Sequence, residues 1–162
     1  MRETESIAKF HRHGSPRGLP HGPILVVLAD DHEVMRRNLK ALLDGEHDIR
    51  VVAEAGDLVA AADQVREHAP QVLVLDLRLP DGSTTDRLSG SGLELTALVR
   101  TQMPSTQVVV ITMQENEAFV GKTVDSGAVG FVRKDMAETE LVDAVRAAAR
   151  GERYTSSRVT RH

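Results

Sequence analysis

The 162-residue chain contains no cysteine, which excludes disulfide bonds and metal sites built from thiolates. It also has no apolar stretch close to the roughly 20 residues that span a bilayer. Residues 1–23 are interrupted by His, Arg, Gly and Pro, and they lack the apolar segment of a secretion signal. These absences predict a cytoplasmic protein with no membrane segment.

An excess of basic residues is also missing, because 20 Lys and Arg stand against 24 Asp and Glu, a net charge of −4. This balance argues against nucleic-acid binding that is driven by electrostatics alone. The hydrophobic content of 41% and the charged content of 27% are ordinary for a globular protein. We therefore expect one domain that is large enough to bury a core.

The N-terminal segment differs in composition from the rest of the chain. Five Gly and Pro residues break any regular pattern in residues 1–22, which predicts a disordered leader. Metal binding by the leader stays open, because it carries three histidines: His11, His13 and His21. The expected organisation is a leader at 1–22, a folded domain at 23–150 and a linker or tail at 151–162.

Short apolar runs bounded by polar residues predict strands that are buried on both faces, as in a parallel sheet. Five strands are expected, at 24–29, 49–53, 71–76, 107–112 and 128–132. Five helices are expected between and after them, at 33–43, 58–68, 92–102, 116–126 and 136–150. This alternation predicts an α/β fold with a doubly wound, five-stranded parallel sheet flanked by five helices. The second strand is the most polar, so it is the expected edge.

Acidic residues end two of these apolar runs. Asp30 and Asp31 follow the first strand, and Asp76 ends the third. Ligands of parallel sheets bind beyond the carboxyl ends of the strands. If the two strands are neighbours, three carboxylates converge and repel one another unless a cation joins them, and oxygen ligands favour Mg²⁺. The sequence therefore predicts a magnesium site.

A hydroxyl and an ammonium group are expected at the same edge of the sheet. Thr112 ends the fourth apolar run, and Lys134 follows the fifth. This set is sufficient for phosphoryl transfer, in which a carboxylate is the nucleophile and Mg²⁺ neutralises phosphoryl oxygens. The lysine and the hydroxyl would hold the remaining oxygens.

Together these residues resemble the receiver domain of two-component response regulators, over about residues 23–150. The resemblance rests on an ordered set: Asp30-Asp31, Asp76, Thr112, Phe131 and Lys134. Three local segments are similar to regulators of the NarL/LuxR type: Ala-Asp-Asp-His at 29–32, Asp-Leu-Arg-Leu-Pro at 76–80 and Gly-Glu-Arg-Tyr at 151–154. The resemblance implies a flavodoxin-like fold with strand order 2-1-3-4-5.

The resemblance also implies a phosphoacceptor and a metal site. Asp76 would accept a phosphoryl group from a histidine kinase. Mg²⁺ would bind Asp30, Asp31, Asp76 and the backbone carbonyl of Arg78. Such a protein catalyses its own phosphorylation and dephosphorylation and is not a conventional enzyme.

The remaining roles concern switching and output. Thr112 would hydrogen-bond the phosphoryl group, Lys134 would form an ion pair with it, and Phe131 would reorient when Thr112 moves. The output would be a changed surface near residues 116–150, with homodimerisation on phosphorylation as a further expectation. NarL/LuxR-type receivers precede a DNA-binding helix-turn-helix domain, for which this chain has no room. We expect either a regulator from which that domain was removed or a free-standing receiver, with no direct nucleic-acid binding by this chain.

Two other functions fit part of this pattern. A Mg²⁺-dependent phosphohydrolase of the haloacid dehalogenase kind also uses an Asp at a strand end, but it needs a second Asp two residues later, where this chain has Arg78. A degenerate receiver that acts only as an interaction module is disfavoured by the complete acidic set. It stays open because the loop at 81–92 is longer than the 2–6 residues usual for such loops. The Gly-, Ser- and Thr-rich composition of this loop predicts a mobile flap.

Three of the candidate residues also have simpler interpretations. Phe131 could instead be a core aromatic, and Thr112 could merely end its strand, but for both residues the functional role is the favoured interpretation. His32 stands beside the acidic pair, but a polar residue at the start of a helix explains it better than a metal ligand.

Overall fold

The computed structural model describes residues 22–80, 82, 92–113 and 117–156. In this part of the chain, the strands form one sheet with order β2-β1-β3-β4-β5-β6. All neighbouring strands are parallel. The strands are β1 (Ile24–Ala29), β2 (Ile49–Ala55), β3 (Val72–Asp76), β4 (Gln107–Thr112), β5 (Gly130–Arg133) and β6 (Tyr154–Thr155). The predicted order of the first five strands is confirmed, and β2 lies at an edge as expected.

The predicted number of five strands is wrong, because β6 adds a sixth beside β5. It lies in the stretch 151–162, which we expected to be a linker or tail. Two residues without an apolar run give no sequence pattern of a strand. Backbone pairing with the open edge of β5 holds them in place: the N–H groups of Tyr154 and Ser156 donate to the carbonyls of Val129 and Phe131.

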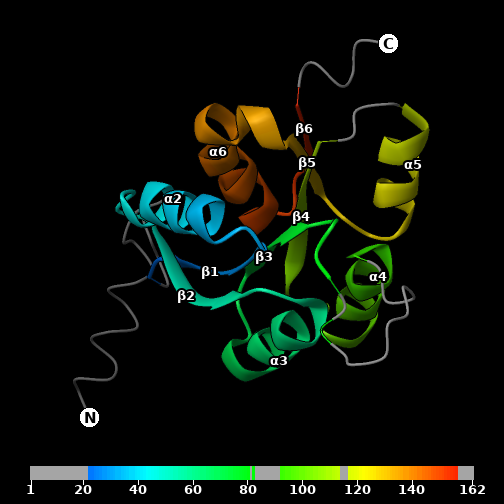
Figure 1. Ribbon diagram of the computed structural model, residues 1–162, viewed down its shortest axis with the longest axis horizontal. Helices are drawn as coiled ribbons and strands as arrows, with labels where there is room; N and C mark the ends of the chain where they lie inside the picture. Colours follow the sequence, from blue (N-terminus) through cyan, green and yellow to red (C-terminus); the bar gives the residue numbers. More distant parts are fainter. Residues whose placement is uncertain (1–21, 81, 83–91, 114–116, 157–162) are drawn as a thin grey trace, which may run out of the picture.

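The five predicted helices are also present in the described residues, and they cover both faces of the sheet (Figure 1). They are α2 (Glu33–Asp44), α3 (Leu58–His68), α4 (Gly92–Gln102), α5 (Glu117–Asp125) and α6 (Ala137–Ala149). A short 3₁₀ helix, η1 (Lys134–Met136), joins β5 to α6. None of the described helices is long and apolar enough to cross a membrane.

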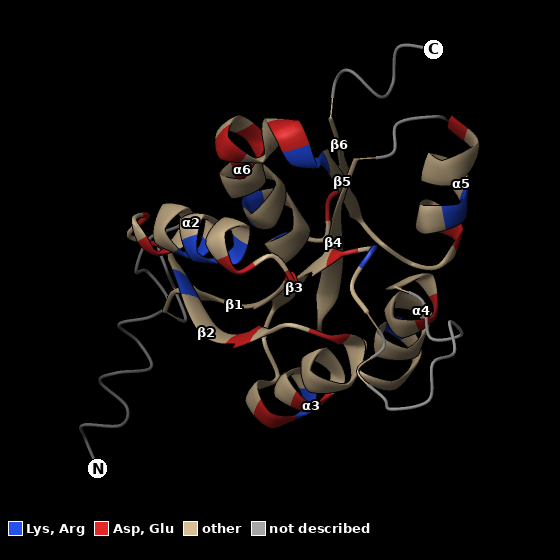
Figure 2. Ribbon diagram, viewed as in Figure 1, with Lys and Arg blue, Asp and Glu red and all other residues tan. Residues whose placement is uncertain are grey.

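Alternating side chains of each strand separate the core into two layers. Val26 and Leu28 of β1 pack with α2 and α6, whereas Val27 and Ala29 pack with α3, α4 and α5. Both faces of the central strands are therefore buried, which explains why their sequences are continuously apolar. In Figure 2 the interior of the sheet is largely tan, and the charged segments, blue and red, lie on helices, on β2 and around the strand ends.

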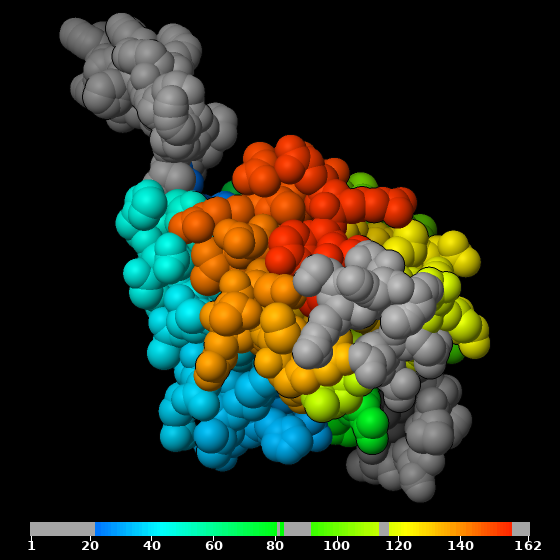
Figure 3. Space-filling view, turned by 90° about the horizontal axis from the view of Figure 1, so that it is seen from above, coloured from blue at the N-terminus to red at the C-terminus, as the bar shows by residue number. Residues whose placement is uncertain are grey.

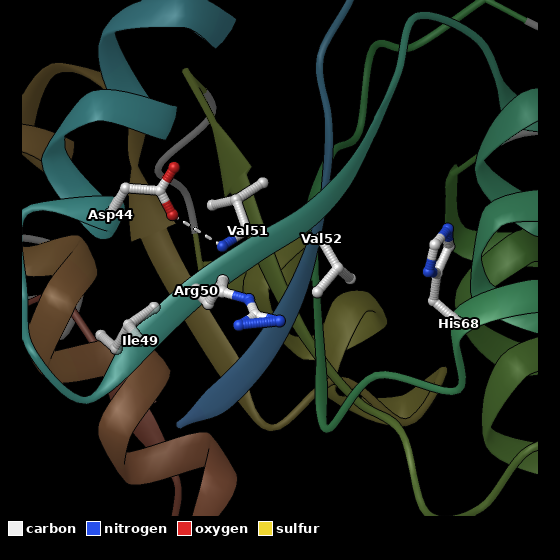
Figure 4. Close-up of a pocket in the computed structure, with 6 residues that line it drawn as sticks. All are labelled: Asp44, Ile49, Arg50, Val51, Val52 and His68. Atoms are coloured by element: carbon white, nitrogen blue, oxygen red, sulfur yellow. Dashed lines mark hydrogen bonds between the residues drawn. The ribbon is translucent and has the colours of Figure 1, made fainter. Parts of the chain in front are cut away.

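The free edge of β2 is partly covered by a side chain of α2. Asp44 accepts a hydrogen bond of 2.8 Å from the backbone N–H of Val51, and Figure 4 shows this contact across one end of an open groove. The groove has a volume of about 620 Å³ and is lined by Asp44, Ile49, Arg50, Val51, Val52 and His68. An irregularity between Val26 and Val27 in the pairing of β1 with β2 further disturbs this edge. Both features discourage pairing with another strand.

The end of the described chain is fixed by side chains as well as by β6. Ser156 is fully buried, and its hydroxyl accepts a hydrogen bond from the backbone N–H of Arg133 and donates one to Glu140. Figure 3 shows α6 between α2 and the residues that follow α6. These contacts attach residues 154–156 to β5 and α6.

Candidate functional site

Strand register brings the predicted site residues to one edge of the sheet. Ala29 of β1 pairs with Leu75 of β3, so the next residues, Asp30 and Asp76, follow neighbouring positions. Thr112 of β4 pairs with Arg133 of β5, immediately before Lys134. The condition for converging carboxylates, namely that β1 and β3 are neighbours, is met.

Asp76 lies at the centre of this edge and is 2% exposed. Its Oδ2 accepts a hydrogen bond of 2.8 Å from Nζ of Lys134, and its Oδ1 accepts one of 3.0 Å from the backbone N–H of Arg78. Burial alone would lower the pKa of Lys134, but the hydrogen bond to Asp76 and the charges of Asp76 and Asp30 outweigh it and raise this pKa. Lys134 therefore stays protonated and holds one oxygen of Asp76.

Asp30 is completely buried, and three of its four polar groups have hydrogen-bond partners. Its N–H donates to the carbonyl of Ala55, its carbonyl accepts from Arg36, and its Oδ1 accepts from the N–H of His32. Its Oδ2 has no hydrogen-bond partner within the described residues and lies 3.4 Å from Nζ of Lys134. Burial raises the pKa of Asp30, against the lowering effects of the His32 N–H and the Lys134 charge, while the charge of Asp76 adds to the rise.

The exposed residues Asp31 and His32 complete a group that could hold a cation. Each has a potential ligand atom, and these atoms and one of Asp30 lie within 4.8 Å of one another. Asp76 is not part of this group and is instead paired with Lys134. Two carboxylates, with one buried oxygen that lacks a hydrogen bond, suit a hard divalent cation such as Mg²⁺. His32 immediately precedes α2, as the helix-start interpretation predicts. Its imidazole makes no capping hydrogen bond with the helix, so this interpretation does not explain why the side chain is a histidine.

Thr112 and Phe131 are both buried, at 1% exposure each. The ring of Phe131 packs edge-on against Phe119 of α5, with ring centroids 6.5 Å apart. Phe131 is thus a core aromatic in this conformation, and its role as a switch stays a prediction. Arg78 is exposed, and metal binding by its backbone carbonyl also stays a prediction.

Two sequence predictions fall largely outside the described residues. Of the loop at 81–92, only Gly82 and Gly92 are described, so the mobile flap is not tested. The leader at 1–22 and its three histidines also lie outside, except for Gly22.

Sequence reasoning missed Arg36, whose guanidinium lies behind the acidic pair. Nη1 donates to the carbonyl of Asp30 at 2.7 Å, and Nε donates to Glu54 of β2 at 3.1 Å. The available signal was its position in the first turns of the helix that follows Asp30-Asp31. An arginine on a surface helix is common, however, and this signal alone does not single it out.

The strand order, together with a buried aspartate held by a lysine beside an acidic pair, is that of a receiver domain. The chain belongs to the family of response regulator receiver domains, whose family model matches residues 26–146.

Similar proteins agree with this assignment. The oxygen regulatory protein NreC of Staphylococcus epidermidis is 36% identical over 135 residues, which cover 83% of this chain and 59% of NreC. Among solved structures, a LuxR-family response regulator from an Aurantimonas species has a TM-score of 0.76 and 31% identity, over 85% of this chain and 93% of that one. The non-phosphorylated receiver domain of the stress response regulator RcsB from Escherichia coli has a TM-score of 0.74 and 28% identity, over 83% of this chain and 98% of that one.

These similarities confirm the NarL/LuxR type of the receiver and favour neither alternative function. A response regulator is a signalling protein rather than a conventional enzyme. This chain spans about 59% of the length of the curated relatives that it matches.

Proposed function

We propose that Asp76 accepts a phosphoryl group from a histidine kinase, in a reaction that depends on Mg²⁺. The observation that carries this proposal is the buried pair of Asp76 and Lys134, with Asp30 beside it. A buried carboxylate at the end of a central strand, with a fixed ammonium group at 2.8 Å, is arranged to receive a group whose oxygens are negatively charged. A purely structural ion pair would not need a second buried carboxylate on the same lysine.

In the transfer, a carboxylate oxygen of Asp76 attacks the phosphorus of the donor phosphohistidine. The new P–O bond forms as the P–N bond breaks, and the departing imidazole nitrogen takes up a proton from solvent. Lys134 then pairs with a phosphoryl oxygen, and the hydroxyl of Thr112 donates a hydrogen bond to another. Lys134 already lies 2.8 Å from Asp76, so its ammonium group would need only a short movement to reach a phosphoryl oxygen.

Asp30 and Asp31 would hold Mg²⁺ together with Asp76 and the backbone carbonyl of Arg78. When bound, the ion neutralises phosphoryl oxygens. The buried Oδ2 of Asp30 supports this role, because a cation would satisfy an oxygen that lacks a hydrogen bond in the described residues. The exposed Asp31 leaves the site open to solvent, from which the ion would enter.

The output would arise at the surface formed by α5, β5 and α6. Phe131 lies in β5 and contacts α5 through Phe119, so a movement of its ring would alter this surface. We propose that phosphorylation changes the binding of this surface to a partner, which includes a second copy of the chain. In the whole regulator, the change would control transcription through a DNA-binding region, and its kinase partner would place it in the cytoplasm.

Intact-mass spectrometry with Mg²⁺ and a small phosphodonor tests the proposal. The parent should gain the mass of one phosphoryl group, and Asp76→Asn should gain none, because the amide is not a nucleophile. Asp63→Asn is the matched control on the exposed face of α3, and it should be phosphorylated like the parent. A phosphate gain by Asp76→Asn would show that the site is wrong, and repeated turnover of phosphate esters would favour a phosphohydrolase.

A further inference from the structure

The guanidinium group of Arg36 connects α2, the residue that follows β1, and β2. Arg36 lies on α2, donates to the backbone carbonyl of Asp30 after β1, and donates to the carboxylate of Glu54 on β2. Its side chain is 21% exposed, and that of Glu54 is 36% exposed. Glu54 therefore fixes one side of the guanidinium while the other side reaches the buried backbone.

This contact completes the fixation of Asp30. The N–H of Asp30 is bound by Ala55, its carbonyl by Arg36 and its Oδ1 by His32. Only Oδ2 is left without a hydrogen bond in the described structure. Arg36 is the one partner in this group that uses a side chain, since Ala55 and His32 use backbone atoms. Arg36 is therefore the partner of Asp30 that a point mutation can remove, because a substitution changes a side chain and leaves the backbone hydrogen-bonding groups in the chain.

We propose that Arg36 is a positioning residue for the cation at Asp30 and Asp31. By holding the carbonyl of Asp30, it sets the direction in which the chain leaves β1 and thus where both carboxylates point. This inference rests on the proposed Mg²⁺ site. Groups that orient metal ligands without touching the metal typically change its affinity by about 10–100-fold when they are removed.

The positive charge of Arg36 and its contact with the Asp30 carbonyl should have opposite effects on Mg²⁺ affinity, so a substitution of Arg36 can distinguish between them. A positive charge beside a cation site repels the cation, so loss of that charge alone should tighten Mg²⁺ binding. Loss of a positioning contact should weaken it. A contribution to folding alone should leave the Mg²⁺ affinity of the folded protein unchanged.

Four variants separate these contributions. Arg36→Gln removes both the charge and the two hydrogen bonds, and Arg36→Lys keeps the charge but cannot reach both partners in the same geometry. Glu54→Gln keeps the charge of Arg36 and weakens its anchor. The matched control is Arg37→Gln, on the next residue of the same helix, whose side chain is 70% exposed and pairs with Glu33.

Mg²⁺ binding is measured by isothermal titration calorimetry at low temperature, after circular dichroism has shown that each variant is folded. We expect Arg36→Gln to weaken binding about tenfold, Arg36→Lys to weaken it severalfold, and Arg37→Gln to stay within about twofold of the parent. Unchanged or tighter binding by Arg36→Gln would overturn the inference. If Arg36→Gln does not fold, Glu54→Gln decides, with about threefold weaker binding expected and unchanged affinity overturning the inference. A parent that binds no Mg²⁺ would instead refute the proposed function.

Discussion

Replacement of Lys134 by methionine is the most informative perturbation of the site. The side chain of Lys134 is 13% exposed, and its ammonium lies between two carboxylates, 2.8 Å from Asp76 and 3.4 Å from Asp30. Methionine keeps most of the volume but removes the charge. Two aspartates, 0% and 2% exposed, would then face each other without a cation.

The expected loss of stability follows from this burial. Removing one partner from a buried ion pair leaves an uncompensated charge, which costs about 3–5 kcal/mol. We take the lower end, about 3 kcal/mol, because the two carboxylates can share a proton. For a chain of this length, each kcal/mol lowers the melting temperature by about 3 °C, so Lys134→Met should melt about 9 °C below the parent.

Thermal unfolding in metal-free buffer, followed by circular dichroism, measures this difference. Added Mg²⁺ should stabilise the variant more than the parent, because a cation can replace the missing ammonium between the carboxylates. Lys122→Met, on the exposed surface of α5, is the control and should melt close to the parent. A Lys134→Met protein that melts within about 2 °C of the parent would refute the electrostatic account of the site.

Two further predictions concern stability. Asp30→Asn removes one of the two buried carboxylates that share the ammonium group of Lys134. This variant should melt at a higher temperature than the parent in metal-free buffer, and it should lose Mg²⁺ binding in calorimetry. A lower melting temperature would contradict this prediction. Arg146→Gln removes the hydrogen bond that mainly lowers the pKa of Asp48. A lowered folded-state pKa gives stability that is present above pH 3.8 and is lost as the pH falls through the folded-state pKa. In urea unfolding at pH 7, the free energy of unfolding of Arg146→Gln should be about 1 kcal/mol lower than that of the parent. The difference should be smaller near pH 3. A difference that does not change with pH would be evidence against this ion pair.

The main fold was predictable because its signals are local and repeated. Each central strand is an apolar run buried on both faces, and the start of α3 carries a recognisable cap, because Asp57 accepts from the N–H of Ala60. The sixth strand had no such signal. Its two residues are placed by the open edge of β5 and by the buried hydroxyl of Ser156, and neither can be read from the local pattern of residues 151–156.

The sequence was enough to predict which residues lie near one another, because the carboxyl ends of parallel strands meet at one edge of the sheet. It was not enough to predict which of these charged residues are buried and which pair with one another. Nothing in the pattern distinguishes the buried Asp30 from the exposed Asp31, or indicates that Lys134 rather than a cation bridges Asp30 and Asp76. The contact of Arg36 with a backbone carbonyl depends on a side-chain conformation, which residue spacing does not determine.

The position of Lys134 also indicates how phosphorylation of Asp76 would affect α6 and β6, which lie outside the site. Lys134 begins η1, which leads directly into α6, and the preceding residue, Arg133, donates its N–H to Ser156. A phosphoryl group on Asp76 would place its charged oxygens beyond the carboxylate that Lys134 now holds, and the ammonium would have to shift toward them. Such a shift would strain the junction of β5 and α6 and the contacts that attach β6. The same ion pair that prepares the acceptor would thus link it to the surface proposed as the output.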